Sequence, residues 1–148
     1  MAHENGEKLY DTFRWKYYVL EPGIKAVSDS ETGKVLYTLY AFEMEMDCGG
    51  LCSFFINSSS ECAPYVSWAL DKAGAFRLKE MYDSFISESG IDVNDLSEFK
   101  TDATDRYETF YSKYDFDSFD EAFYAIYEEE NLHDAIIEYI RNNSQAIS

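Results

Sequence analysis

The chain has 148 residues, which is the length of one domain with a buried core of its own. Aromatic residues make up 18% of it, and this abundance excludes a disordered acidic chain, because disordered chains are poor in aromatic residues. The formal net charge of −17 argues against direct binding of nucleic acid or of an anionic membrane, and it favours a basic protein or cations as partners.

The first part of the chain predicts two long helices separated by a loop. Apolar residues recur at helical spacing over about residues 6–20, and turn-forming residues predict a loop over 21–33. A second helix is predicted over about 34–47. Its end, 42–47, also alternates apolar and acidic residues, which fits a strand. A helix is favoured because one apolar stripe continues through Leu36, Tyr40 and Met44.

Two shorter helices are predicted in the middle of the chain. A Gly-Gly pair at 49–50 breaks the second helix, and an apolar helix follows over about 50–57. Ser60 is predicted to be the N-cap of the next helix, which carries Pro64 in its first turn and runs to about Ala73.

A longer helix is predicted over about 76–89, with Gly90 just after its end. The residues 91–103 are polar and are predicted to be irregular. The apolar residues predicted to face inward from this helix are Phe76, Met81, Phe85 and Ile86.

Three helices are predicted to close the chain. The first covers about 104–113. The second is predicted to begin at Ser118, whose spacing to Glu121 makes a capping box, and its apolar stripe ends at Tyr127. The third is predicted to begin near Asn131.

These elements predict one all-α domain over residues 1–148, with about six to eight helices and little or no sheet. The start of the sequence has no apolar run typical of a signal peptide, and no apolar run reaches the ~20 residues needed to cross a bilayer. Cys48, Cys52 and Cys62 are an odd number, which favours reduced thiols, and we expect them to be small core residues. A cytoplasmic location is therefore expected.

The excess negative charge is unevenly distributed along the chain. Residues 1–79 carry 11 acidic and 8 basic residues, a net charge of −3, whereas residues 80–148 carry 18 acidic and 4 basic residues, a net charge of −14. Such asymmetry creates a field around one part of the molecule. We refer to residues 80–148 as the acidic half.

Three segments carry a family resemblance. Residues 43–57 combine an acidic stretch, a Gly-Gly pair and a Phe-Phe-x-Asn ending. Together with the block 66–75 and the closing segment 115–142, they resemble a bacterial DMP-type domain family of unknown function, over about residues 34–142. Cys48 stands where this family usually has Asn or another polar residue.

The best-known member of that family is a DNA-mimic protein, an acidic helical dimer that occupies the DNA-binding surface of a transcription factor. The resemblance therefore implies a helical fold and a role in mimicry, and it allows a homodimer. It does not transfer the partner, which from the charge alone would be a basic protein surface such as that of a DNA-binding protein.

The acidic residues of the last three predicted helices are the candidate binding residues. Carboxylates three or four positions apart on a helix lie ~5–6 Å from one another and can compete with phosphates for a basic surface. The alternative interpretation is a solvated, charge-rich surface without a partner. The candidate residues are Asp102, Asp105, Glu108, Glu121, Glu128, Glu129, Glu130, Asp134 and Glu138.

Other functions remain as alternatives. An immunity or accessory protein that neutralises a basic toxin would need the same charge. A metal site or enzyme would use carboxylates around 43–47 or 115–121. The second cluster misses the EF-hand register, because Asp120 stands where Gly is needed and Ile126 where Glu is needed. The Gly-Gly pair lacks the Lys of a phosphate loop, so we expect no cofactor and no metal.

Overall fold

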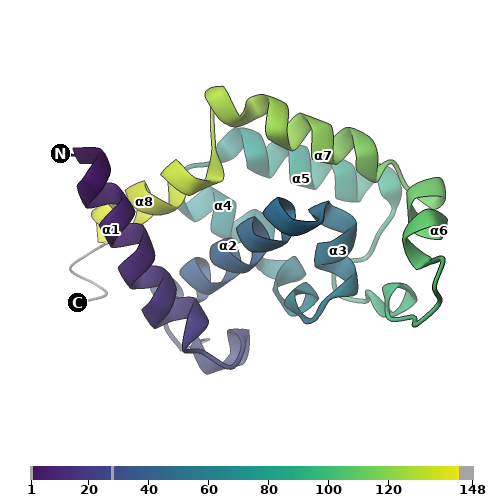
Figure 1. Ribbon diagram of the computed structural model, residues 1–148, viewed down its shortest axis with the longest axis horizontal. Coiled ribbons are helices and arrows are strands. Elements are labelled where there is room, and N and C mark those ends of the chain that lie inside the picture. Colours follow the sequence, from purple (N-terminus) through teal and green to yellow (C-terminus); the bar gives the residue numbers. More distant parts are fainter. Residues whose placement is uncertain (1, 28, 144–148) are drawn as a thin grey trace.

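The computed structural model describes residues 2–27 and 29–143 (Figure 1). Within this part of the chain every regular element is helical, which confirms the all-α prediction. The α-helices are α1 (Ala2–Arg14), α2 (Glu31–Cys48), α3 (Gly50–Ile56), α4 (Val66–Lys72), α5 (Phe76–Ser89), α6 (Arg106–Lys113), α7 (Phe116–Ala125) and α8 (Leu132–Asn143). Shorter turns of helix connect them: a π-helical turn at Trp15–Val19 and 3₁₀ turns at Ile24–Val27, Ser58–Tyr65, Ser97–Phe99 and Ile126–Glu128.

Helix α2 is the centre of the molecule. It begins at the N-cap Ser30, whose hydroxyl accepts a hydrogen bond from the Gly33 N–H at 3.0 Å. It packs against α1, α3, α4 and α8, and residues all around its circumference are buried. A helix surrounded on all sides needs no polar face, which explains why its end fits a strand pattern as well as a helical one.

The other helices are arranged around α2. Helix α1 lies against α8 at one end of the molecule, and α6 lies at the opposite end (Figure 1). Helices α5 and α7 run side by side along one edge. The fold therefore places α6, α7 and α8, which belong to the acidic half, along the length of the molecule.

Aromatic rings fill the centre of the core. The Phe55 and Phe99 ring centroids are 5.4 Å apart, and Phe116 contacts both rings. All three side chains are fully buried. Phe99 comes from the segment after Gly90, so this irregular segment is anchored in the core by an apolar residue.

Two predicted helix starts are wrong. Ser60 is not an N-cap, because the chain forms a 3₁₀ run up to Tyr65 and α4 begins at Val66. Pro64 explains the difference, since proline has no N–H and disfavours the α conformation at the preceding residue. Helix α7 begins at Phe116 and not at Ser118. The Asp115 carboxylate accepts a hydrogen bond from the Ser118 N–H at 3.3 Å and is the true cap.

Three side chains predicted to be buried are exposed. Phe76 is 61% exposed because it is the first residue of α5 and extends beyond the packed part of that helix. Tyr127 is 54% exposed because it lies in a 3₁₀ turn, where the tighter rotation moves it off the stripe of α7. Cys48, the last residue of α2, is also exposed, whereas Cys52 and Cys62 are buried as expected.

Candidate partner-binding surface

The structure distributes the candidate acidic residues along the molecule and does not gather them in one row. Asp102 and Asp105 lie before the start of α6, Glu108 lies on α6, and Glu121 lies on α7. The stretch 128–130 lies between α7 and α8. The remaining candidates, Asp134 and Glu138, lie on α8 at the end opposite to α6 (Figure 1).

Some of these carboxylates are exposed and unpaired within the described part of the chain. They have neither a hydrogen bond nor an ion pair, so their full charge faces solvent. They are Asp102, Asp105, Glu108, Glu121 and Glu128.

The other candidates have intramolecular partners. Glu129 pairs with Arg77, and Glu138 pairs with Arg141 at 2.9 Å. Asp134 accepts a hydrogen bond from the Asn131 side-chain amide, and the Asn131 Oδ1 in turn accepts from the Asp134 N–H at 2.8 Å at the start of α8, which the sequence predicts near Asn131. Exposed pairs of this kind stabilise a fold by ~0–1 kcal/mol, and their charges are partly neutralised.

Glu130 has a structural contact that the sequence does not predict. Its carboxylate accepts a hydrogen bond from the Leu78 N–H at 2.7 Å. Leu78 lies in the first turn of α5, and the N-cap residue of that helix is Ala75, which has no side-chain acceptor. Glu130 therefore caps α5 from 52 positions away along the chain.

The four bases of the acidic half leave most of its acids without an ion pair among the described residues. The Lys100 ammonium binds backbone carbonyls, and Lys113 pairs with Glu98 at 2.9 Å. The Arg106 guanidinium lies against the Tyr107 ring, with 5.6 Å between its Cζ and the ring centroid. With only four bases against 18 acids, two of them paired with carboxylates, the acidic half keeps a strongly negative field.

Further exposed acids lie on α5 and α7, where sequence reasoning placed only Glu121. Glu80 and Glu88 on α5 and Asp117 on α7 are exposed and unpaired within the described residues. The i, i+4 spacing of Asp117 and Glu121 could have indicated that both acids lie on one face of a helix. The position of the α5 acids beside α7 depends on tertiary packing, so the sequence does not indicate it.

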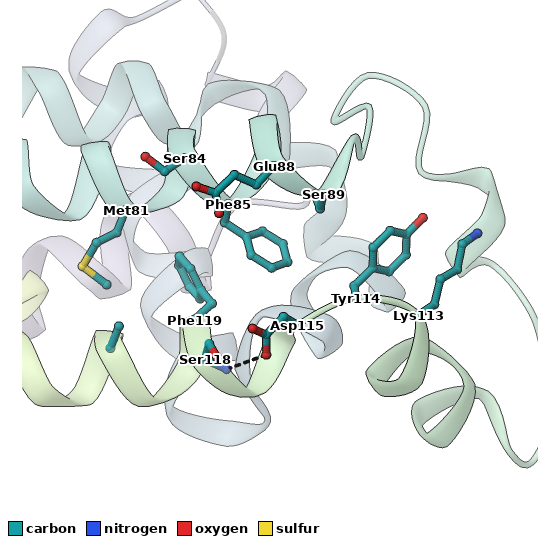
Figure 2. A pocket seen from close by; sticks show the side chains of 11 residues that line it. Met81, Ser84, Phe85, Glu88, Ser89, Lys113, Tyr114, Asp115, Ser118 and Phe119 are labelled. Carbon is teal, nitrogen blue, oxygen red and sulfur yellow. Dashed lines mark hydrogen bonds between the residues drawn. The ribbon is translucent and has the colours of Figure 1, made fainter.

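An open groove of about 660 Å³ separates α5 from α7 (Figure 2). Its floor is apolar: Phe119 is buried, and Met81 and Phe85 are partly buried. The Phe85 and Phe119 ring centroids are 5.5 Å apart. Carboxylates of Glu88 and Asp115 line it from opposite helices. The groove thus combines an apolar floor with acidic sides.

The Gly-Gly pair has a structural explanation in a long-range helix cap. The Asp120 carboxylate, on α7, accepts a hydrogen bond from the Leu51 N–H in the first turn of α3 at 3.1 Å and another from the Tyr111 hydroxyl at 3.1 Å. Gly50 has φ +85°, and a Cβ atom there would lie 2.8 Å from the Asp120 Cγ. A glycine is therefore required for both the conformation and the space.

Helix α3 is capped at its other end by a cation. The Lys100 Nζ donates to the carbonyls of Phe55, Ile56 and Asn57 at 3.0, 2.9 and 2.9 Å. Burial lowers the pKa of Lys100. The Asn57 side chain donates to the buried Glu45 carboxylate at 2.8 Å. The segment with Gly-Gly and Phe-Phe-x-Asn is thus a core helix held at both ends by charged side chains of the acidic half.

The family model of DMP19-like proteins matches residues 30–143. The chain belongs to the DMP19-like protein family. The matched range begins at Ser30, the N-cap of α2, and ends with the last residue of α8. The family region therefore corresponds to α2–α8, and α1 packs on it from outside the matched range. No curated protein and no solved structure matches the chain in comparable searches.

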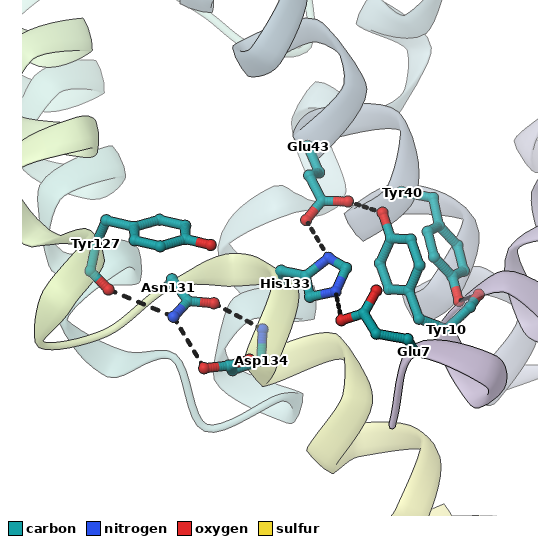
Figure 3. A network of polar contacts seen from close by, with 8 residues as sticks. All are labelled: Glu7, Tyr10, Tyr40, Glu43, Tyr127, Asn131, His133 and Asp134. Carbon is teal, nitrogen blue, oxygen red and sulfur yellow. Dashed lines mark hydrogen bonds and ion pairs between the residues drawn. The ribbon is translucent and has the colours of Figure 1, made fainter. Parts of the chain in front are cut away.

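In this member of the family, α1 is fastened to α2 and α8 by a polar network (Figure 3). His133 on α8 lies between two carboxylates: its Nε2 is 2.6 Å from Glu7 and its Nδ1 is 3.6 Å from Glu43. The Tyr10 hydroxyl donates to the buried Glu43 carboxylate, and the Tyr10 carbonyl accepts from Tyr40 at 3.0 Å. The nearby Glu43 carboxylate, joined by Glu7, raises the pKa of His133 to about 9, against the effect of burial.

Four of the carboxylates considered for a metal site have other roles. Asp115 and Asp120 cap helices, and Glu43 and Glu45 are bound by His133 and Asn57. Among residues 2–27 and 29–143, no three acidic, His or Cys side chains converge in a way that could hold a metal ion.

The buried thiols offer no nucleophile. Burial raises the pKa of both Cys52 and Cys62 to about 12, so both stay protonated at neutral pH. Across the described residues, no helix is long and apolar enough to cross a membrane.

Proposed function

We propose that this protein is a non-enzymatic binding protein of the DNA-mimic type, whose acidic half occupies the basic surface of a DNA-binding protein. The observation that carries the proposal is the set of exposed, unpaired carboxylates on and around α5, α6 and α7, in a half of the chain that has only four bases. The free cysteines are consistent with a cytoplasmic site of action.

The physical basis is competition with phosphates. A protein that binds DNA gains much of its affinity by contacting phosphates with Lys and Arg, and the same cations can pair with carboxylates. Helix α7 has 10 residues and spans about 15 Å, a length over which duplex DNA carries about nine phosphates. The α5–α7 pair carries fewer exposed acids than this, so we propose that the protein imitates a short patch of DNA.

The test is capture of basic proteins on the immobilised full chain at low salt, followed by elution with duplex DNA or with salt. The variant Glu108→Gln/Glu121→Gln/Glu128→Gln removes three exposed charges of the acidic half. The matched control, Asp11→Asn/Asp29→Asn/Asp71→Asn, removes three charges outside it.

We expect DNA and salt to release the partner, and we expect the acidic-half variant to retain much less of it than the control does. The proposal is wrong if DNA releases nothing, or if the two triple variants retain the partner equally. A partner released by salt and not by DNA would instead favour the neutralisation of a basic toxin, because a toxin surface has no need to bind DNA.

A further inference from the structure

The α5–α7 groove has the geometry of a site for a helix. It lies between two helices that run side by side, and its apolar floor follows α5 from Met81 to Phe85 (Figure 2). Along α5 the lining runs from Met81 to Ser89, about 12 Å or just over two helical turns. An amphipathic helix is recognised in such a groove through apolar residues at i, i+4 and i+7.

The charges around the groove define the chemistry of that helix. Glu88 on α5 and Asp115 at the start of α7 face the groove from opposite sides (Figure 2). Glu80 lies one turn before the lining residue Ser84, and Glu121 lies three residues after Ser118, so acids continue along both sides. Lys113 also lines the groove, but its charge is paired with Glu98 at 2.9 Å.

We propose that the α5–α7 groove binds an amphipathic basic helix of the partner protein, with its apolar side chains on Phe85 and Phe119 and its Lys or Arg residues against the acidic sides. This inference rests on the proposed function, because it takes the partner to be basic. It adds that the groove recognises a helix of that partner. The apolar floor supplies shape selectivity, which an acidic surface alone lacks, since exposed charges attract any cation.

The test compares two labelled synthetic peptides by fluorescence anisotropy at physiological salt. One is a helix of about fifteen residues with Leu at i, i+4 and i+7 and Lys at most other positions. The other is an isomer of the same composition whose Leu residues do not share a helical face. Both have the same charge, so a difference in their affinity measures recognition by the groove.

Two Ser→Arg variants of the full chain locate the binding. Ser84→Arg places a bulky cation at the side of the groove, and Ser112→Arg makes the same change on α6, outside it; both serines are exposed. Circular dichroism and thermal unfolding should be the same for both variants, because neither side chain packs in the core. A second pair, Glu88→Gln and Glu108→Gln, compares loss of one charge inside and outside the groove.

We expect the amphipathic helix to bind about tenfold more tightly than its isomer. In the Ser84→Arg variant the two peptides should bind with equal affinity. Ser112→Arg should weaken both peptides by the same small factor. Glu88→Gln should weaken the helical peptide more than Glu108→Gln does.

Two results would overturn the inference and are distinguishable. If both peptides bind equally and both are released by salt, the acidic half binds basic ligands without using the groove, and the proposed function survives. If neither peptide binds even at low salt, the proposed function fails together with the groove.

Discussion

At the scale of single residues, His133 is a charged centre that sequence reasoning did not single out. It lies between Glu7 and Glu43 and stacks on Tyr10, with 4.1 Å between the ring centroids. The carboxylates favour the imidazolium, and burial of Glu43 raises the pKa of that carboxyl while His133 opposes the increase. These contacts fix α1 to α2 and α8.

Stability should therefore depend on pH through His133. Its pKa rises from 6.5 to about 9 on folding, so the stabilisation is fully present below pH 6.5 and is lost as the pH rises through 9. The full shift corresponds to ~3 kcal/mol, and partial exposure of the imidazole reduces our expectation to about 2 kcal/mol. Urea unfolding of the wild type and of His133→Gln at several pH values measures this contribution. If the free energy of unfolding changes with pH equally in the two proteins between pH 6.5 and 9, the prediction is contradicted.

At the scale of elements, α3 shows how a short helix is held in place. A helix of seven residues is too short to be stable alone, and it leaves unpaired N–H groups at its start and unpaired carbonyls at its end. Asp120 and Lys100 satisfy groups at the two ends, and their charges oppose the helix dipole in the favourable sense. These two residues of the acidic half therefore stabilise the fold, although their charge alone would suggest a role in the surface that binds a partner.

Removal of either cap should destabilise the fold. Lys100→Met leaves the carbonyls at the end of α3 without their partner, and Asp120→Ala does the same to the Leu51 N–H and the Tyr111 hydroxyl. We expect each change to lower the free energy of unfolding by about 1–2 kcal/mol. Lys113→Met, which breaks an exposed pair with Glu98, is the control and should cost at most ~1 kcal/mol. Urea unfolding measures these changes in the free energy of unfolding. If Lys113→Met destabilises the protein as much as the two cap variants do, the capping role is refuted.

At the scale of the whole molecule, the uneven charge has a cost. The acidic half holds 18 acidic residues and 4 basic ones, and its exposed carboxylates repel one another. The fold tolerates this repulsion because the half is extended along the molecule, from α6 at one end to α8 at the other (Figure 1). A surface with uncompensated charge is suited to long-range attraction of a basic partner.

Salt should therefore stabilise this protein in the absence of any partner. The screening length falls from ~30 Å at 0.01 M to ~8 Å at 0.15 M salt, which weakens the repulsion between exposed carboxylates. We expect the free energy of unfolding to increase by about 1 kcal/mol over this range. Glu108→Gln/Glu121→Gln/Glu128→Gln should be more stable than the wild type at low salt and should respond less to added salt. A wild-type melting temperature that stays constant between these salt concentrations would show that the repulsion is negligible.

Local sequence patterns were sufficient to predict the helical class, a narrow range for the number of helices, most of the helix limits and the charge asymmetry. Helical periodicity and termination depend on residues a few positions apart, so Gly90 and Asn131 mark their helix ends correctly. Where the local pattern admitted two answers, as for 42–47, the continuous apolar stripe indicated the helix that the structure contains. The predicted caps at Ser60 and Ser118 were wrong, because a proline and a better acceptor nearby changed the local geometry.

Which acids are available to a partner depends on contacts between distant segments of the chain. Asp120 and Glu130 cap helices that lie 69 and 52 positions away along the chain, and no local pattern distinguishes them from the exposed Glu121 and Glu128. The groove has the same origin, since its two walls are separate helices that come together through the packing of Phe85 on Phe119. Hydrogen bonds and packing between distant segments depend on the three-dimensional path of the chain, whereas charge and periodicity are properties of the sequence itself.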